Sequence, residues 1–492
     1  MTPKACVIGA GPNGLAAAIF LAQMRWNVEV FEAEPQPGGA ARTLELTLPG
    51  FHHDFGSAVY PFAAGSPFFS TLPLSNHGLE WIQSPCPLAH PFDDGTAITL
   101  ERDLHAAESA LEDDGGIWRK LMQPFVERWS DLSSEVLRPV HVLSRHPFLL
   151  ARFGLLAFPS AKMIARIFFR SQRTKALFAG LAAHSFLSLD EPLSAAFGLL
   201  LGVSAHAVGW PIPRGGARSL TEALCGHLAE LGGEIKTSSR IGSLASLPES
   251  DAILCDVTPL QLTRIAGSRL SAVYTARLAR YRYGPAAFKV DYALSSPIPW
   301  KASECFRAAT VHLGGSADEI AASEMVMQHD HSERPFVIVA QPSLFDPTRA
   351  PAGKHIAWAY CHVPNGCEFD MLETLESQIE RFAPGFRDCI LARRVFPPAA
   401  LENMDANLIG GDISGGAMDV HQFFFRPTWR HYETSAKNIY LCSSSTPPGG
   451  GVHGMCGYHA ARSVVSNLKM SLSSRLEHRA HQTEKRYPGD WR

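Results

Sequence analysis

The sequence lacks the features that mark several classes of protein. Its 492 residues contain no run of about 18 uninterrupted apolar residues, so we expect no membrane-spanning helix. The formal net charge is only −3 at pH 7, which gives no electrostatic reason to expect a nucleic acid as a partner. The ten cysteines form no CxxC pair and no metal-ligand pattern, and no secretory signal precedes the first apolar strand. We therefore expect a cytoplasmic protein with reduced thiols and no metal site.

The overall composition is that of an ordinary globular protein. Hydrophobic residues make up 46% of the chain and charged residues 18%. A chain of this length can form two or three domains, each with a core of its own. Composition and length therefore limit the fold class and the number of domains but indicate no function. The function has to be inferred from sequence motifs.

Residues 5–34, ACVIGAGPNGLAAAIFLAQMRWNVEVFEAE, predict a strand, a glycine-rich turn, a helix and a second strand. The glycines fit the pattern G-x-G-x-x-G, which allows a tight turn, a close approach of backbone to a pyrophosphate and close helix packing. An acid ends the second strand about twenty residues later, where it can accept hydrogen bonds from a ribose. We predict a dinucleotide site; the acid disfavours NADP, whereas NAD and FAD both stay open. The predicted site consists of Gly9, Gly11, Pro12, Asn13, Gly14 and Glu32.

The motif that follows, PQPGGAART over residues 35–43, resembles an extension found in the superfamily of FAD-binding amine oxidases and phytoene desaturases. The resemblance implies FAD as the cofactor, with Gly38, Gly39 and Arg42 near its phosphates. One arginine that is usual in the family pattern is replaced here by Ala40.

Residues 51–62, FHHDFGSAVYPF, resemble the loop that lies beside the isoalloxazine ring in the same superfamily. An ordinary β-turn is the alternative interpretation of this stretch. The resemblance implies that Ser57 contacts the cofactor, and it makes Tyr60 a candidate catalytic residue near the ring.

Residues 438–464, NIYLCSSSTPPGGGVHGMCGYHAARSV, predict a strand, a polar turn, three glycines and a helix. The segment resembles the last strand and helix of the superfamily's FAD domain, where glycines and a helix N-terminus meet the flavin. This implies cofactor contacts for Ser444, Gly451 and Val452. Many relatives have Gly-Ala-Gly where this chain has three serines, so the backbone must lie differently. His453 is either an acid or base near the ring or a hydrogen-bonding residue at the helix start.

A third stretch, residues 210–241, also resembles the superfamily, with a glycine pair that opens an amphipathic helix before a strand. The resemblance implies that Ile241 touches the adenine. We therefore predict an α/β fold: a Rossmann-type, glutathione-reductase-like FAD domain built from discontinuous segments, with an α+β substrate domain. The FAD domain would comprise 1–75, 206–275 and 431–470, the substrate domain 76–205 and 276–430, and a polar tail 471–492.

Residues 136–189 contain eight lysines and arginines and no aspartate or glutamate, interleaved with apolar stretches. Two interpretations compete for this segment. It can lie on an anionic membrane as basic amphipathic helices, or it can cap the core with a solvated basic face, which we favour.

The resemblance implies an FAD-dependent oxidoreductase that desaturates or dehydrogenates a small hydrophobic substrate by hydride transfer to flavin N5. A flavin amine oxidase is one alternative, and a non-enzymatic flavoprotein that acts through partner proteins is the other. The chain has no second G-x-G-x-x-G unit for NAD(P)H, so electrons would leave through oxygen, a quinone or a protein acceptor.

Overall fold

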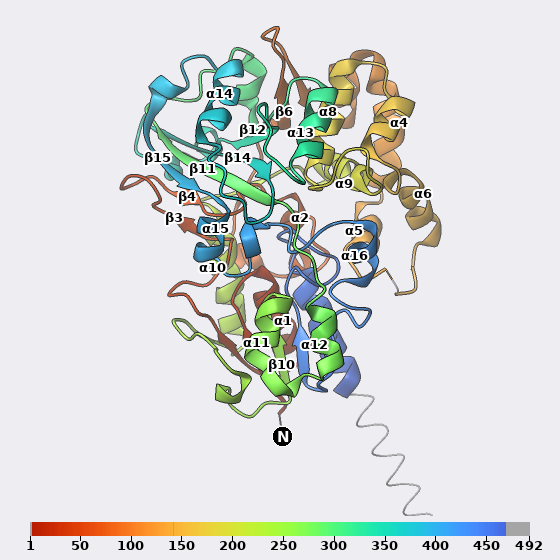
Figure 1. The fold of residues 1–492 in the computed structure, drawn as a ribbon, viewed down its shortest axis with the longest axis vertical. Helices are drawn as coiled ribbons and strands as arrows, with labels where there is room; N and C mark the ends of the chain where they lie inside the picture. Colours follow the sequence, from red (N-terminus) through yellow and green to blue (C-terminus); the bar gives the residue numbers. More distant parts are fainter. Residues whose placement is uncertain (1, 141, 469–492) are drawn as a thin grey trace, which may run out of the picture.

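Two large sheets organise the chain in its computed structural model, and helices cover the faces of both (Figure 1). The structure describes residues 2–140 and 142–468, so the polar tail expected at 471–492 lies outside the described residues. A five-stranded sheet occupies the end of the molecule that holds the N-terminus, and a seven-stranded sheet occupies the other end.

The five-stranded sheet is parallel throughout, in the order β16–β10–β1–β2–β9. Its strands are β1 (Lys4–Ile8), β2 (Asn27–Phe31), β9 (Glu234–Lys236), β10 (Ala252–Cys255) and β16 (Ile439–Leu441). Its covering helices include α1 (Pro12–Gln23), α10 (Ala217–Glu230), α11 (Pro259–Ala266) and α12 (Ala272–Leu278). Successive side chains of β1 point to opposite faces, so Val7 packs with α1 and α10 while Ile8 packs in the core that α11 and α12 complete.

This sheet confirms the predicted α/β fold class with a Rossmann-type unit, because β1, α1 and β2 follow one another as the sequence indicated. The other three strands come from the middle and the C-terminal part of the chain. Their membership supports the predicted assembly of the FAD domain from three segments, and the division into domains stays a prediction.

The seven-stranded sheet has the order β15–β11–β14–β13–β12–β6–β7 and is antiparallel except where β12 pairs with β6. Its strands are β6 (Cys86–Pro91), β7 (Ala97–Leu100), β11 (Ala286–Leu294), β12 (Ala308–Leu313), β13 (Val337–Ala340), β14 (His355–Val363) and β15 (Ile390–Phe396). All nine residues of β11 are buried, so this strand has packing on both faces. Alternate positions serve two cores: Ala287 faces the helices that follow β7, whereas Phe288 faces α14 (Leu372–Phe382).

Most of the remaining helices cover the first of these faces. They are α3 (Leu104–Ala110), α4 (Gly115–Val126), α5 (Trp129–Val136), α6 (Pro147–Ala157), α7 (Ala161–Phe168), α8 (Gln172–Ala183), α9 (Ser194–Ala207) and α13 (Ala317–Val326). The segment 136–189 thus forms α6, α7 and α8, and each of them buries part of its surface in the core around Trp118 and Phe178. Short elements complete the fold: α2 (Pro61–Ala64), α15 (Pro398–Met404), α16 (Val420–Phe425), and the pairs β3 (Thr43–Leu44) with β4 (His53–Asp54) and β5 (Trp81–Ile82) with β8 (Ile212–Pro213).

Candidate functional site

A cavity of about 340 Å³ borders both halves of the fold. One part of its wall comes from the glycine-rich turn before α1, and another from β11, β13 and β14 of the seven-stranded sheet. The structure brings nine of the predicted site residues to this lining: Gly11, Pro12, Asn13, Gly39, Ser57, Tyr60, Ser444, Gly451 and Val452. Segments from both ends of the sequence therefore meet at one cavity.

The glycine turn has the shape that a pyrophosphate needs. Gly9 adopts φ +95°, and its N–H donates to the Phe31 carbonyl at 2.8 Å, which closes the turn onto β2. A Cβ added at Gly14 would lie 2.1 Å from the carbonyl oxygen of Gly9, so only glycine permits this approach of helix to strand. α1 begins at Pro12 and its N-cap residue Gly11 offers no side-chain cap, which leaves the Asn13 N–H beside the cavity for an anion. These residues fit the phosphates of a dinucleotide.

Glu32 lies beside this turn rather than in the cavity lining. One of its carboxylate oxygens accepts from the Ala10 N–H at 2.7 Å and the other from the Glu34 N–H at 2.9 Å. A carboxylate oxygen can accept two hydrogen bonds, so each retains one acceptor position for a ribose hydroxyl. The same side chain thus holds the turn and suits the predicted contact with the nucleotide.

Arg42 contributes to the loop rather than to the cavity wall. Its Nε donates to the Gly39 carbonyl at 2.6 Å and its Nη2 to the Met404 carbonyl at 2.7 Å. Its guanidinium also lies 5.4 Å from the ring centre of Phe55. The arginine is therefore committed to protein groups, and a phosphate contact at this position stays a prediction. Gly38 acts in the same loop, because its N–H donates to the Ala10 carbonyl at 2.9 Å.

The glycine triplet at 449–451 does not lead directly into the helix, because the helix covers 455–468. A Cβ added at Gly449 would lie 2.6 Å from Nη1 of the buried Arg426, and one at Gly450 would lie 2.5 Å from the Ser414 carbonyl oxygen. Two of the three glycines thus serve close packing, and only Gly451 lines the cavity.

The two catalytic candidates from the sequence differ in position. Tyr60 lines the cavity, and burial raises its pKa well above the usual value, so it stays a neutral phenol that donates to the Ser57 carbonyl. His453 is buried outside the lining, and burial lowers its pKa to about 4. Its Nδ1 accepts from the Met455 N–H at 3.0 Å. This geometry supports a hydrogen-bonding role at the helix start. Ile241 also lies outside the lining, half-buried beside the core of the five-stranded sheet.

Sequence reasoning missed an ion pair in the cavity wall. Lys289 on β11 lines the cavity with its side chain 6% exposed, and its Nζ donates to the fully buried Asp291. Burial lowers the pKa of Lys289 and raises that of Asp291 to about 6. The signal was present in AAFKVDYAL, because two charged residues in an apolar strand are rare unless they are paired.

Asp291 also lies beside His53, whose neighbour in the chain forms a second buried ion pair. His53 Nδ1 lies 3.7 Å from Asp291 Oδ1, and neighbouring Asp54 pairs with Arg349 at 2.8 Å. Burial lowers the pKa of His53 to about 3, so the imidazole is neutral at pH 7. Lys289 is therefore the member of this network that reaches the cavity.

Aromatic side chains were also missed. Trp358 and Tyr360 lie two residues apart on β14 and therefore on the same face, with ring centres 5.6 Å apart, and both line the cavity. Trp210 and His184 complete this side, and burial lowers the pKa of His184 to about 3. The wall opposite the glycine turn is therefore aromatic and uncharged apart from Lys289.

Two carboxylic acids line the cavity near the glycine turn. Asp256, at the end of β10, accepts from the Gly14 N–H at 2.8 Å, and burial raises its pKa to about 7. Burial also raises the pKa of Asp405, which accepts from the Asn407 N–H at 3.0 Å. The raised pKa of Asp256 places part of its population in the neutral form at pH 7, which reduces repulsion of a bound phosphate.

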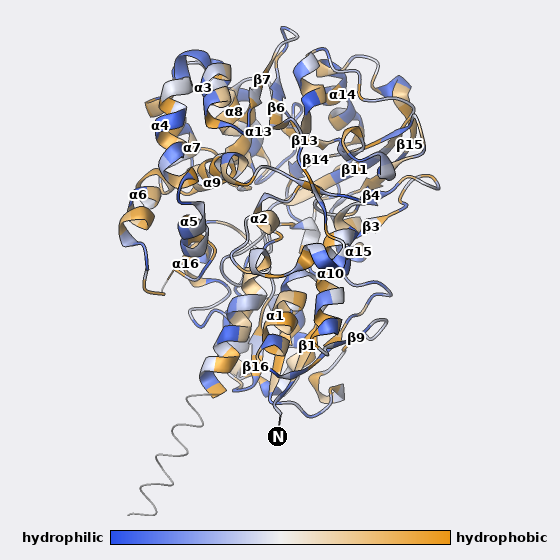
Figure 2. Cartoon of the chain, turned by 180° about the vertical axis from the view of Figure 1, so that it is seen from behind, coloured by the Kyte–Doolittle hydropathy of each residue, from blue (hydrophilic) through white to orange (hydrophobic). Residues whose placement is uncertain are grey.

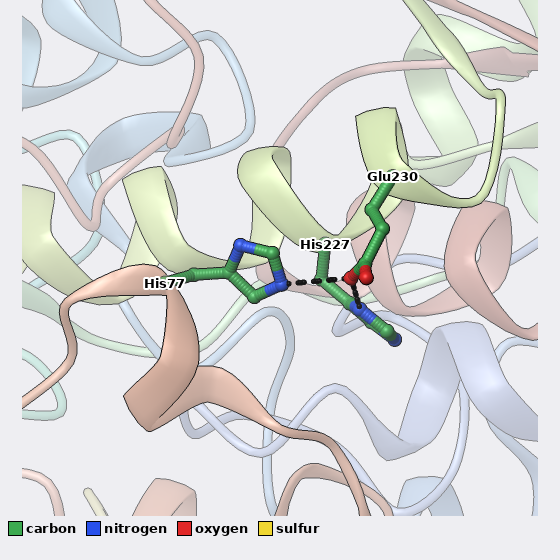
Figure 3. A group of neighbouring side chains, drawn as sticks. All are labelled: His77, His227 and Glu230. Atoms are coloured by element: carbon green, nitrogen blue, oxygen red, sulfur yellow. Dashed lines mark hydrogen bonds and ion pairs between the residues drawn. The ribbon is translucent and has the colours of Figure 1, made fainter.

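Among the described residues, one group has the composition of a metal site, and it lies outside the cavity (Figure 3). Glu230 Oε2 lies 3.1 Å from His77 Nε2 and 3.3 Å from His227 Nδ1. These hydrogen bonds account for the arrangement without an ion. The other nitrogen of His227 is buried without a partner, whereas a metal-ligating histidine usually donates its second N–H. The expectation of no metal stays a prediction.

Comparisons with known proteins agree with this geometry. The family described as "NAD(P)-binding Rossmann-like domain" matches residues 7–69. Pyridine nucleotide-disulfide oxidoreductase domain-containing protein 2 of Rattus norvegicus is 26% identical, over 94% of each chain. Phytoene dehydrogenase of Streptomyces griseus is 25% identical, over 91% of each chain. The structure of a putrescine oxidase triple mutant superposes with a TM-score of 0.60 at 15% identity, over 94% of this chain and 99% of that one.

The chain is thus similar over nearly its whole length to proteins named for phytoene dehydrogenation and for a pyridine nucleotide-disulfide oxidoreductase domain. These similarities confirm the resemblance to the phytoene desaturase and amine oxidase superfamily seen in the motifs, and with it the broad class of oxidoreductase. The likeness to putrescine oxidase concerns the fold alone. The word "disulfide" in the name of the rat relative finds no counterpart here, because all ten cysteines are free thiols.

Proposed function

We propose that this chain is an FAD-dependent oxidoreductase that dehydrogenates an apolar substrate. One observation carries the proposal: a single cavity joins the uncapped start of α1 to a chamber with aromatic and aliphatic walls. When bound, FAD supplies a hydride acceptor at N5, and the protein supplies position and electrostatics.

Residues at two ends of the cavity suit the two ends of the cofactor. The Asn13 N–H in the first turn of α1 would bind the pyrophosphate, and Glu32 would accept from the ribose. Gly451 and Val452 would contact the flavin, where the missing side chain of Gly451 leaves the backbone accessible.

The chamber beyond the glycine turn suits an apolar molecule. Its walls include Phe55, Leu201, Trp210, Ile338, Trp358 and Tyr360. Such walls hold a substrate by apolar contact and exclude water, and they position it with few charged groups. Oxidation of a C–C bond removes a hydride and a proton from adjacent carbons. Bound FAD would supply the hydride acceptor, a base or solvent would take the proton, and oxygen, a quinone or a protein would serve as the final electron acceptor.

Lys289 is the cationic side chain in this chamber wall. Its hydrogen bond to Asp291 commits one N–H to the carboxylate, and its remaining N–H groups are donors at the cavity. A donor in a water-poor wall stabilises negative charge that develops nearby. We therefore assign Lys289 an electrostatic role in the reaction.

A flavin amine oxidase is the second candidate, and Trp358 with Tyr360 is the observation that favours it. Two aromatic rings in one wall can hold an amine by its cation or its carbons. The carboxyls of Asp256 and Asp405 lie by the glycine turn, which gives an ammonium group little charge to bind at the aromatic side.

The test is anaerobic mixing of the FAD-loaded protein with panels of polyenes, acyl compounds and amines, followed by the visible flavin absorption. We expect apolar compounds to bleach the flavin, and Trp358→Leu to slow the bleaching. Trp429→Leu is the matched control, because Trp429 is exposed and lies outside the cavity. Bleaching by amines alone favours the amine oxidase. No bleaching by any compound, with FAD retained, favours a non-enzymatic flavoprotein.

A further inference from the structure

Large apolar side chains are exposed on α6 and α7 and in the short segments on either side of α6. Leu143, Phe148 and Leu155 are 91%, 89% and 78% exposed, and Phe158, Met163 and Ile167 are also exposed. Figure 2 shows that the ribbon of α6 is largely apolar, although it lies on the outside of the molecule. We call these six residues the α6–α7 surface.

The pattern on α6 differs from that of an ordinary surface helix. Leu149, Phe153 and Ala157 are buried at intervals of four, which gives the helix a normal core face. Phe148, Arg152 and Leu155 lie on the opposite face at helical spacing, so the solvent side is also apolar, with an arginine between two large side chains.

The short helix α7 repeats this pattern. Ala161, Ile164 and Ala165 are buried, while Lys162, Met163, Arg166 and Ile167 are exposed together. Basic and apolar side chains therefore alternate on the outer face of both helices.

The arginines of this surface have no carboxylate partners. In the segment 136–189, Arg138, Lys162 and Arg173 pair with Glu135, Asp190 and Asp94. The exposed side chains of Arg145, Arg152, Arg166 and Arg170 form no ion pair with any described residue. Four unpaired cationic side chains among large apolar side chains are complementary to a partner whose outer layer is anionic and whose interior is apolar.

We infer that α6 and α7 dock the protein on an anionic lipid bilayer, with the apolar side chains inserted between headgroups and the arginines on the lipid phosphates. An interfacial amphipathic helix lies in the membrane plane with its apolar face about 5–10 Å deep. The apolar surface continues next to the α6–α7 surface in a groove whose lining includes Val140, Phe424, Phe425 and Trp429.

The dimensions of the helices favour this orientation over a membrane crossing. Within the described residues, no single helix has the length and apolar composition that a crossing requires. α6 and α7 meet that test only when joined, and the chain bends by 95° between them. Eleven and eight residues span about 16 and 12 Å, far less than the roughly 30 Å of a bilayer core.

The proposal concerns docking and does not depend on the reaction proposed above. A bilayer docked on α6 and α7 would nevertheless lie close to the cavity. α6 and α7 both pack on α9, and Leu201 of α9 lines the cavity wall. One helix therefore separates the docking surface from the chamber.

The experiment is flotation of the FAD-loaded full chain with vesicles of phosphatidylcholine alone or mixed with phosphatidylglycerol. We expect binding to the mixed vesicles only, weakened by added salt. Each arginine near an anionic surface changes binding about fivefold, so the triple variant R152Q/R166Q/R170Q should bind about 10²-fold more weakly. The matched control is R264Q/R277Q/R280Q, which removes three exposed arginines from α11 and the α12 region, at the other end of the molecule.

A second readout tests insertion itself. The exposed Phe148 is replaced by tryptophan, and we expect its added fluorescence to shift to the blue and to be quenched by brominated lipid. Equal flotation of the triple variant and the wild type would overturn the proposal, and so would no binding to mixed vesicles. Concentration-dependent dimers that F148S/L155S abolishes, without vesicle binding, would instead assign the surface to a second copy of this chain.

Discussion

Replacing Lys289 with methionine removes the cation from a buried ion pair and keeps the length of the side chain. Asp291 then remains fully buried behind the wall without its hydrogen-bonded cation, and the neighbouring His53 is neutral. Removing one partner of a buried pair costs about 3–5 kcal/mol of folding stability, because an unpaired charge stays in the interior. We therefore expect K289M to be strongly destabilised.

The double variant K289M/D291N separates the charge from the packing. Asparagine has the shape of aspartate without its charge, so the double variant contains no unpaired buried carboxylate at this position. We expect the double variant to recover about 2 kcal/mol or more relative to K289M, which is a coupling energy typical of contacting residues. Lys354→Met is the control, because this exposed lysine should change stability by less than about 0.5 kcal/mol.

The pH dependence gives an independent check. Burial already holds the pKa of Asp291 at about 6, above its usual range, and loss of Lys289 raises it further. Protons then bind the folded variant more tightly than the unfolded chain. The penalty of K289M relative to wild type is therefore full above the raised pKa and shrinks as the pH is lowered from there toward about 6, the wild-type pKa of Asp291. The assay is urea unfolding followed by tryptophan fluorescence at several pH values. A K289M variant as stable as the double variant, or with a penalty independent of pH, would refute this reasoning.

Gly14→Ala should abolish FAD retention, because the new Cβ would lie 2.1 Å from the Gly9 carbonyl oxygen, whereas Gly242→Ala meets open space and should bind normally. Glu32→Ala should weaken FAD binding by about 1.5–3 kcal/mol in a fluorescence titration, through loss of a charged acceptor, and unchanged binding would place the nucleotide elsewhere. His184 is neutral when folded, with a pKa lowered to about 3, so the unfolded state binds its proton more tightly. Protonation of the unfolded state therefore lowers the free energy of unfolding as the pH falls below about 6.5. In His184→Gln, the slope of this free energy against pH should be smaller by the equivalent of one proton, and a slope identical to wild type would contradict this.

The glycine turn was predictable because its causes are local. A strand, three spaced glycines, a helix and an acid specify one geometry wherever they occur, and β1, α1 and β2 take up that geometry. The outcome at the triplet 449–451 shows the limit of such reasoning. Two of its glycines are required by Arg426 and Ser414, which approach from a segment whose position no local rule predicts.

The chamber could not be predicted because it depends on strand pairing across long distances in the chain. Lys289 and Trp358 belong to β11 and β14, whose antiparallel register places both on the cavity side of one sheet. The sequence shows the charged pair in β11 but not the cavity that it faces. Arg42 gives the opposite case, since a residue implied at the phosphates is held by the carbonyl groups of Gly39 in its own loop and of Met404 at the end of α15.

The central claim, that the turn before α1 holds FAD for an oxidation, is tested most directly by cofactor content. The protein is saturated with FAD, freed of excess by gel filtration and precipitated with acid, and the supernatant is assayed for FAD and for NAD(P). The account predicts one FAD per chain, released without a covalent bond, and no stoichiometric NAD(P). A colourless protein that retains no FAD, or one that retains NAD(P) instead, would contradict it.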